Sequence, residues 1–300
     1  MSGEIRLGLV GGGVSYHGRA FAGIINGINE AELPARIFPV YAHRPLGARV
    51  SAIYFEQAAE AAMIARVTNI DKVAKSPQEL IDHVDGVLVV EDCSMEHQRL
   101  ANTFLNAGMT VFIDKPLAPT VDEAEGIFAR AIKGGATLMS TSAARYSARI
   151  NELKRSLGAI DPLMVQCFGM NEIIYYGVHA VEALVTLLGP GATAVRALGD
   201  EAVNLVEVHY PDKRRGALSI LGNFPGPLCA CAFGKKGCRL VEASDLDAAY
   251  GTMLETFVEA VRARKPPVEY RETLEVVKLT VAVKEAILSG ERIEIAPSTI

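Results

Sequence analysis

Residues 7–13 read Leu-Gly-Leu-Val-Gly-Gly-Gly, an apolar segment that runs directly into three consecutive glycines. An apolar strand followed by such a turn lets backbone N–H groups approach a pyrophosphate closely, at the positive end of the next helix. We therefore predict that Gly11, Gly12, Gly13 and the adjacent Val14 contact a dinucleotide cofactor. The alternative interpretation is a tight strand-to-helix turn that binds no ligand.

A second informative stretch, Val-Phe-Ile-Asp-Lys-Pro, occupies residues 111–116. Proline biases the residue before it towards extended backbone, so Lys115 is expected at the end of a strand. In an open α/β sheet that position faces the crevice in which ligands bind. The ammonium group of Lys115 could there stabilise alkoxide charge that develops during hydride transfer, and we place Asp114 beside the cofactor with it. The alternative is a surface lysine after an edge strand.

The residues around these motifs alternate between strand and helix patterns, as in a parallel sheet that is covered on both faces. Strands are expected at 5–10, 35–42, 86–90, 110–113 and 136–139, with helices at 16–28 and 49–64 among those between them. The later pattern is typical of antiparallel strands with helices, and places strands at 163–168, 202–209, 215–221 and 228–233. We predict two domains, residues 1–118 and 119–300, with C-terminal helices that could pack back on the first.

Composition restricts the classes of partner and cellular location. The chain has 300 residues, of which 50% are hydrophobic, and a net charge of −5, so we expect no nucleic-acid partner. We see neither a secretion signal nor an apolar stretch of the roughly 18 residues that cross a bilayer, and we expect a cytoplasmic protein without membrane contact. The five cysteines fit free thiols. Because no histidine lies near Cys229, Cys231 and Cys238, we predict no metal site.

Taken together, these features resemble the glucose–fructose oxidoreductase / inositol dehydrogenase / MocA (Gfo/Idh/MocA) family of NAD(P)-dependent oxidoreductases. The likeness covers nearly the whole chain and rests on residues 11–13, 112–116, 177–179, 257–260, 265–267 and 289–292. It implies an α/β Rossmann-type parallel-sheet domain, followed by an α+β domain whose open, mainly antiparallel sheet often forms a dimer interface. It also implies that Lys115 and His179 flank the reacting carbon.

The chain departs from the family pattern in its cofactor motifs. Tyr16 stands at the position of the usual third glycine, and Asp114 replaces a glutamate. The loop after the expected strand at 86–90 reads Asp-Cys-Ser at residues 92–94, where the family often has Thr-Pro-Asn. We assign Asp92 and Ser94 of this loop to the cofactor. A dinucleotide is still expected, whereas a standard sugar dehydrogenase site is not implied.

The predicted acid–base residue is His179, because imidazole exchanges protons near neutral pH. Its catalytic role rests on the pairing with Lys115 that the resemblance implies, since a histidine before an apolar helix is otherwise often a packed or capping residue. The family often has aspartates four residues before and three residues after this histidine, where the chain has Tyr175 and Glu182. Tyr175 could hand a proton onward or could be a core aromatic residue.

The preferred cofactor depends on the residues just after the second strand. NAD sites usually place an Asp or Glu there to hold the ribose 2′-hydroxyl. The strand expected at 35–42 leads into His43 and Arg44, without an acid. A guanidinium suits a 2′-phosphate, so we predict that His43 and Arg44 bind NADP in preference to NAD. The alternative is that Arg44 is a solvated loop charge.

These observations predict an oxidoreductase that moves a hydride between the nicotinamide and a small carbonyl or hydroxyl substrate, such as a sugar or cyclitol. Two alternatives remain open: a cofactor-binding sensor without turnover, and a reductase of imines or enones. We also expect a homodimer, or a tetramer, through the C-terminal sheet. Its outer face would carry Leu218, Leu221 and Cys231 or their alternating neighbours. The alternative is that these residues point into the core and the outer face is polar.

Overall fold

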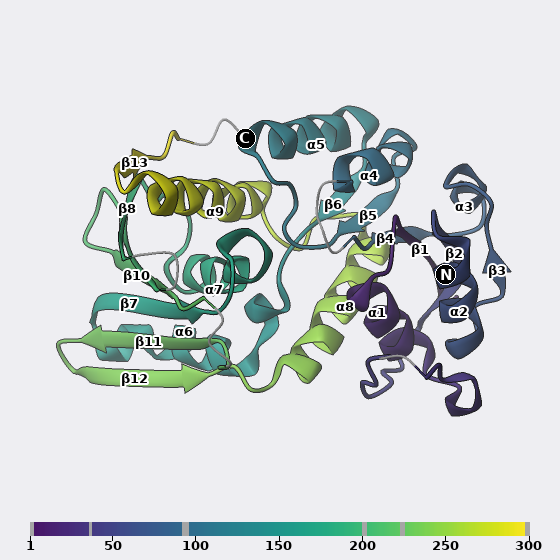
Figure 1. Cartoon of the computed structure of the whole chain (residues 1–300), viewed down its shortest axis with the longest axis horizontal. Coiled ribbons are helices and arrows are strands. Elements are labelled where there is room, and N and C mark those ends of the chain that lie inside the picture. The colour runs from purple at the N-terminus through teal and green to yellow at the C-terminus, as the bar shows by residue number, and fades with distance from the viewer. Residues whose placement is uncertain (1–2, 36–37, 92–95, 200–202, 223–225, 298–300) are drawn as a thin grey trace. The chain divides into compact units, whose positions relative to one another are not determined.

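The computed structural model describes residues 3–35, 38–91, 96–199, 203–222 and 226–297. The chain forms two compact units (Figure 1). Unit 1 comprises residues 1–118, 125–140 and 250–267, and unit 2 comprises residues 119–124, 141–249 and 268–300. Because the chain passes between the units several times, a division into independently folding domains after residue 118 stays a prediction.

Unit 1 contains a six-stranded parallel sheet in the order β3-β2-β1-β4-β5-β6, which confirms the predicted α/β class. Its strands are β1 (Ile5–Gly11), β2 (Ala48–Phe55), β3 (Lys72–Val73), β4 (Gly86–Val89), β5 (Thr110–Ile113) and β6 (Thr137–Met139). The helices that connect them are α1 (Tyr16–Asn26), α2 (Ala58–Val67), α3 (Gln78–Ile81), α4 (His97–Asn106) and α5 (Val121–Gly134). Strand order reverses beside β1, which pairs with both β2 and β4, and this is where such sheets bind ligands.

The central strand β1 is apolar because both of its faces are covered. Leu7, Leu9 and Val10 have no solvent-exposed area, as expected for a strand inside a parallel sheet. Gly11 ends the strand where a side chain would not fit. A Cβ atom there would lie 2.6 Å from the Phe55 ring and 2.8 Å from the Val90 carbonyl oxygen. Glycine therefore lets the turn after β1 pack directly against its neighbours.

The second strand lies later in the chain than predicted. The strand expected at 35–42 is wrong, because residues 35 and 38–47 form no regular structure; residues 36 and 37 lie outside the described part. The helix expected at 49–64 is also wrong, since 48–55 is β2 and α2 begins only at Ala58. Pro39 disfavours a central strand in the first segment. Buried and partly exposed residues alternate through most of β2, as in a strand.

Unit 2 contains a seven-stranded sheet in the order β12-β11-β7-β10-β9-β8-β13, antiparallel except for the pair β7 and β10. This confirms the predicted open, mainly antiparallel sheet. Its strands are β7 (Pro162–Gly169), β8 (Ala194–Gly199), β9 (Asn204–His209), β10 (Arg215–Ile220), β11 (Cys229–Gly234), β12 (Gly237–Glu242) and β13 (Arg292–Glu294). The helices are α6 (Ala148–Ile160), α7 (Val178–Leu188) and α9 (Tyr270–Ser289), while α8 (Leu246–Ala263) joins the two units. Strands β8, β12 and β13 were not predicted.

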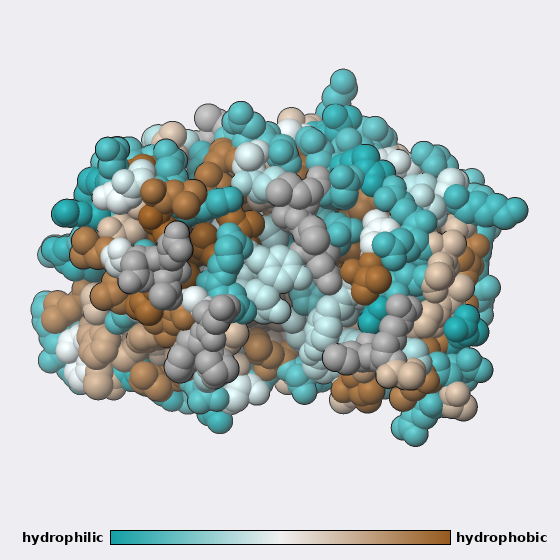
Figure 2. All heavy atoms as spheres, viewed as in Figure 1, coloured by the Kyte–Doolittle hydropathy of each residue, from teal (hydrophilic) through white to brown (hydrophobic). Residues whose placement is uncertain are grey.

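The core of unit 2 lies between one face of this sheet and its helices. Leu218 has no exposed area and belongs to that core, so its predicted place on the outer face is wrong. The residues that alternate with Leu218 along β10, and their partners in the adjacent strands, form the outer face instead. Cys231 is on this outer face, because it pairs in register with Gln166 and Leu240. Apolar side chains gather over the strands of unit 2 in the surface view (Figure 2).

Candidate active site

The glycine turn of unit 1 lies between the ends of β2 and β4. The N–H groups of Glu56 and Gln57, just after β2, donate to the carbonyl oxygens of Gly11 and Gly12 at 3.1 and 3.2 Å. After the turn, the Ser15 hydroxyl caps α1 by accepting from the Gly18 N–H at 3.0 Å. The predicted residues Gly11, Gly12 and Gly13 thus form a turn at the carboxyl edge of the sheet. Val14, half exposed, comes directly after them.

A buried carboxylate already accepts hydrogen bonds from this turn. Glu91, two residues beyond the end of β4, is 8% exposed. Its Oε2 atom accepts from the Gly12 N–H at 3.0 Å and from the Gly13 N–H at 3.3 Å. Sequence reasoning missed Glu91, because in the sequence it is one acidic residue before a loop without a recognisable motif. The neighbouring predictions Asp92 and Ser94 lie outside the described residues.

An acidic residue does follow the true second strand. Glu56 comes directly after β2, and its Oε2 lies 3.5 Å from the position that a Cβ on Gly12 would take. Its Oε1 pairs with the Arg99 guanidinium of α4 at 2.8 Å. This is the position from which NAD sites hold the ribose 2′-hydroxyl. The sequence pattern does not point to Glu56, because it predicts the second strand at 35–42 instead of 48–55.

His43 and Arg44 lie towards the other edge of the parallel sheet. The Arg44 N–H donates to the Ile24 carbonyl oxygen at 2.8 Å, near the end of α1, and His43 Nδ1 lies 3.2 Å from the same oxygen. A few residues on, Gly47 accepts a hydrogen bond from Ile5, the first residue of β1. The glycine turn lies at the opposite ends of β1 and α1. The premise of the predicted NADP preference, an arginine directly after strand two, is therefore not met.

Lys115 and Asp114 follow β5 and are both buried, with 6% and 1% of their surface exposed. The Asp114 Oδ2 atom lies 2.5 Å from Nδ1 of His17, a residue of α1 whose Nε2 is 3.1 Å from the Tyr250 hydroxyl. Burial by itself raises the pKa of Asp114, but the charges of His17 and Lys115 and the His17 hydrogen bond outweigh it. The resulting pKa is about 2, so Asp114 is an anion beside Lys115.

His179 belongs to a separate network in unit 2. It is the second residue of α7, and its Nδ1 lies 2.7 Å from the Ser142 hydroxyl. The Ser142 N–H donates to Glu182 Oε2 at 3.3 Å, and the Thr141 hydroxyl donates to Glu182 Oε1 at 3.0 Å. Glu182, which comes one helical turn after His179, therefore acts on it through Ser142. Sequence reasoning missed Ser142 because it lies far from the histidine in the chain.

The Glu182 carboxylate is nearly buried and paired with an arginine. Arg145 Nε lies 2.5 Å from Glu182 Oε1, and Arg145 Nη1 lies 2.7 Å from Glu272 Oε2. Burial lowers the pKa of Arg145, but the two carboxylates outweigh it and raise that pKa above its ordinary value. The guanidinium is therefore a permanent cation that pairs with both carboxylates.

Tyr175 lies on a short π-helical turn, η3 (Ile173–Gly177), just before α7. Its N–H donates to the Glu172 carboxylate at 2.8 Å, and its ring packs edge-on against Tyr176 at 5.0 Å between centroids. The ring of Tyr176 in turn lies 6.1 Å from that of His179. Tyr176, the next residue of the same turn, is thus an aromatic neighbour of the histidine.

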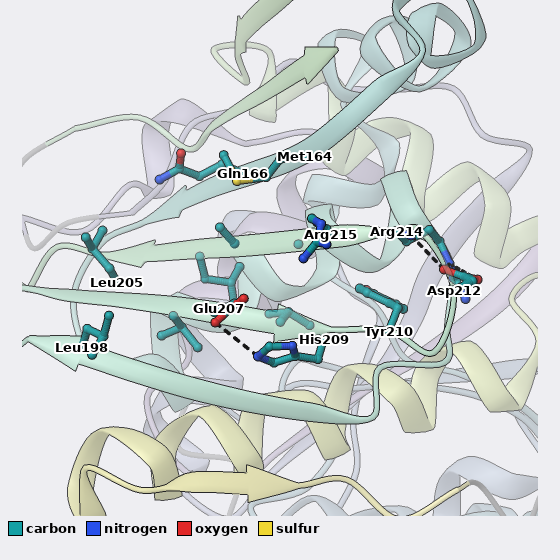
Figure 3. A pocket seen from close by; sticks show the side chains of 15 residues that line it. Met164, Gln166, Leu198, Leu205, Glu207, His209, Tyr210, Asp212, Arg214 and Arg215 are labelled. Carbon is teal, nitrogen blue, oxygen red and sulfur yellow. Dashed lines mark hydrogen bonds and ion pairs between the residues drawn. The ribbon is translucent and has the colours of Figure 1, made fainter. Parts of the chain in front are cut away.

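The outer face of the unit 2 sheet has a shallow hollow of about 440 Å³. Its lining combines apolar residues with charged ones, among them Met164, Leu198, Leu205, Glu207 and Arg215 (Figure 3). Glu207 and His209 lie within it, with a carboxylate oxygen 3.2 Å from Nε2. Lys115, His179 and Glu182 do not line this hollow, so we do not assign it to the chemistry.

Neither a metal cluster nor a membrane-spanning helix is found among the residues that the structure describes. Within them, no group of three or more His, Cys, Asp or Glu side chains is placed to hold a metal ion. The cysteines described there, Cys167, Cys229, Cys231 and Cys238, are free thiols. No described helix is both long enough and apolar enough to span a membrane.

Comparison with known proteins relates the first part of the chain to a family. Residues 5–142 match the GFO_IDH_MocA model, described as an oxidoreductase family with an NAD-binding Rossmann fold. No curated protein matches the sequence significantly.

Among solved structures, the chain is similar to myo-inositol dehydrogenase from Lactobacillus casei in complex with NAD(H) and myo-inositol, at 18% identity and a TM-score of 0.81 over 99% of this chain and 98% of that one. It is also similar to scyllo-inositol dehydrogenase from Lactobacillus casei with bound NAD(H) and scyllo-inositol, at 15% identity and a TM-score of 0.79 over 97% and 98% of the two chains. A putative myo-inositol dehydrogenase from Sinorhizobium meliloti 1021 matches at 17% identity and a TM-score of 0.80, over 97% of this chain and 100% of that one. Residues 5–142 therefore match the NAD-binding Rossmann fold of the Gfo/Idh/MocA oxidoreductase family, and the chain as a whole has the fold of these dehydrogenases.

Proposed function

We propose that the chain transfers a hydride between the nicotinamide of NAD(H) and an oxygen-bearing carbon of a small polyhydroxylated substrate, such as a cyclitol or sugar. The observation that carries this proposal is the position of Lys115. It is a buried lysine at the carboxyl end of β5, in the sheet whose central strand ends in the glycine turn. The carboxyl ends of parallel strands meet at one edge, so an ammonium group would lie beside the cofactor.

Lys115 would polarise the substrate oxygen, and the bound cofactor would supply the hydride chemistry. Its ammonium group stabilises the negative charge that develops on this oxygen when the hydride moves. Asp114 next to it is an anion with a pKa of about 2. His17 of α1 contacts the Asp114 carboxylate. This contact within unit 1 fixes the orientation of Asp114 beside Lys115.

His179 would exchange the proton of the substrate hydroxyl at Nε2. The contact between Ser142 and Nδ1 fixes the orientation of the ring. Glu182 holds Ser142 in place through its backbone N–H. Tyr175, in the turn before α7, remains the candidate that hands the proton onward.

NAD(H) would be preferred to NADP(H), because the side chain after β2 is Glu56 rather than an arginine. A carboxylate accepts hydrogen bonds from a ribose 2′-hydroxyl and repels a 2′-phosphate. Calorimetric titration of both cofactors tests this preference. We expect tighter binding of NADH to the wild type, a reduced preference in Glu56→Gln, and an unchanged preference in the control Arg44→Ala. A preference for NADPH that Arg44→Ala abolishes would reverse the assignment.

The reaction is tested by incubating the protein and NAD⁺ with a panel of inositols and sugars and following the absorbance of NADH. We expect NADH to form with at least one polyol, and the product to be the corresponding ketone. NADH binding without turnover on polyols, imines or enones would instead favour a sensor on this scaffold.

The outer face of the unit 2 sheet would bind a second copy of the chain. Four large apolar side chains expose between 42% and 65% of their surface: Leu198, Leu205, Phe233 and Leu240. The strand register places the last three on the outer face, beside the other residues of that face. A two-fold partner is the commonest cover for such a patch. Light scattering should give a dimer or tetramer, and Leu205→Lys should shift it towards the monomer. The free thiols on the same face fit the cytoplasm.

A further inference from the structure

The N–H groups that would bind a pyrophosphate are already occupied in this chain. Gly12 and Gly13 both donate to one oxygen of Glu91, at 3.0 and 3.3 Å. A Cβ on Gly12 would lie only 2.7 Å from that oxygen, so the carboxylate is packed directly against the turn. Glu91 is 8% exposed and reaches the turn from a position 79 residues away in the sequence.

A carboxylate in this position presents the same kind of acceptor oxygens as one edge of a phosphate. Both are anions whose oxygens accept from backbone N–H groups next to a helix N-terminus. The two cannot use the same pair of donors at once, and at a few ångströms they repel each other. Glu56 adds a second carboxylate, with its Oε2 3.5 Å from the Cβ position of Gly12. The pyrophosphate would therefore enter a site that already carries negative charge.

We infer that Glu91 is an internal competitor of the cofactor pyrophosphate and sets the affinity of the chain for its dinucleotide. The carboxylate must leave Gly12 and Gly13 before the cofactor can use their N–H groups. Part of the binding free energy of the cofactor is then spent on this displacement, and the affinity falls. The inference rests on the proposed function, because it requires that a dinucleotide binds at this turn.

The test compares ligands that do and do not contain a pyrophosphate. Affinities of NADH, ADP-ribose and adenosine are measured by calorimetry for the wild type, Glu91→Ala and Glu91→Gln. Because the competing group is a charged acceptor, we expect NADH and ADP-ribose to bind about tenfold or more tightly to Glu91→Ala. Adenosine should bind equally to all three. Glu91→Gln should fall between, because its neutral amide still accepts but does not repel the phosphates.

The matched control is Glu79→Gln, which removes the same charge from an exposed residue of α3 in the same unit. It should bind all three ligands like the wild type. Glu91→Gln keeps an acceptor for the turn, so it tests the inference even if Glu91→Ala fails to fold in a thermal melt. Binding of NADH to the variants but not to the wild type would support the inference strongly.

Three results would overturn it. Equal affinity of wild type and variants for NADH would remove the competitor and leave the proposed function intact. Weaker NADH binding by both variants would mean that Glu91 supports the bound cofactor. Absence of NADH binding in every protein would overturn the proposed function together with the inference.

Discussion

The chemical groups of unit 1 lie at the ends of buried parallel strands, whereas His179 of unit 2 depends on a network of side chains. Gly11 and Lys115 are placed by β1 and β5, so the backbone itself fixes their positions. His179 lies on a helix and is oriented by Ser142, which in turn depends on Glu182. Substitution of Lys115 should therefore change chemistry with a small loss of stability, whereas substitution of Glu182 should change both chemistry and stability.

The largest expected effect is that of Glu182→Ala on stability. The substitution leaves the nearly buried Arg145 without its closest partner, and breaking such a pair typically costs about 3–5 kcal/mol. Chemical denaturation measures the loss in the free energy of unfolding. The control Glu272→Ala removes the more exposed carboxylate from the same guanidinium and should cost much less. Equal losses in the two variants would show that Glu182 is not the centre of the network.

Lys115→Met should lower turnover by about a hundredfold to a thousandfold, the effect of losing one donor that stabilises developing oxyanion charge. NADH affinity should remain close to that of the wild type. The control is Lys278→Met, a lysine of unit 2 that is also 6% exposed and whose ammonium donates to the Pro297 carbonyl oxygen at 3.0 Å. Turnover per folded molecule should persist in that control. Full turnover in Lys115→Met would contradict the role proposed for Lys115.

The third prediction concerns the acid dependence of stability through Asp114. Its pKa falls from 3.8 to about 2 on folding, so the folded protein binds fewer protons than the unfolded chain in that range. The stabilisation, about 2 kcal/mol, is fully present above pH 4 and is lost as the pH falls through 2. Denaturation of the wild type and Asp114→Asn between pH 2 and 6 should show a difference that shrinks towards acid. A difference that stays constant with pH would contradict the shifted pKa.

The smallest expected effect is that of Ser142→Ala, which removes one hydrogen bond from His179. Such bonds contribute about 1 kcal/mol, so turnover should fall by about tenfold or less. A purely structural role for Ser142 would leave the pH profile of kcat unchanged. In Ser142→Ala we expect the part of the pH profile of kcat that depends on His179 to shift. Ser142→Thr, which keeps the hydroxyl, should return the profile to that of the wild type. An unmoved profile would separate Ser142 from the acid–base step.

Local sequence was sufficient for features that depend on a few consecutive residues. The apolar run into glycines at 7–13 predicted β1 and its turn, because only glycine fits against Phe55 and the Val90 carbonyl. The Asp-Lys-Pro segment predicted a strand end, since proline restricts the residue before it. The alternating patterns after residue 160 predicted most of the antiparallel sheet. In each case the physical cause lies within a short stretch of chain.

The tertiary structure alone decided the features that join distant residues. β2 at 48–55 is fixed by pairing with β1, and this pairing brings Glu56 rather than Arg44 to the glycine turn. The bonds from Gly12 to Glu91 and from Ser142 to Glu182 span 79 and 40 residues. An isolated glutamate in a sequence carries no sign of which backbone N–H group it will meet. That choice follows from strand order and helix packing, which bury the carboxylate and require it to find a partner.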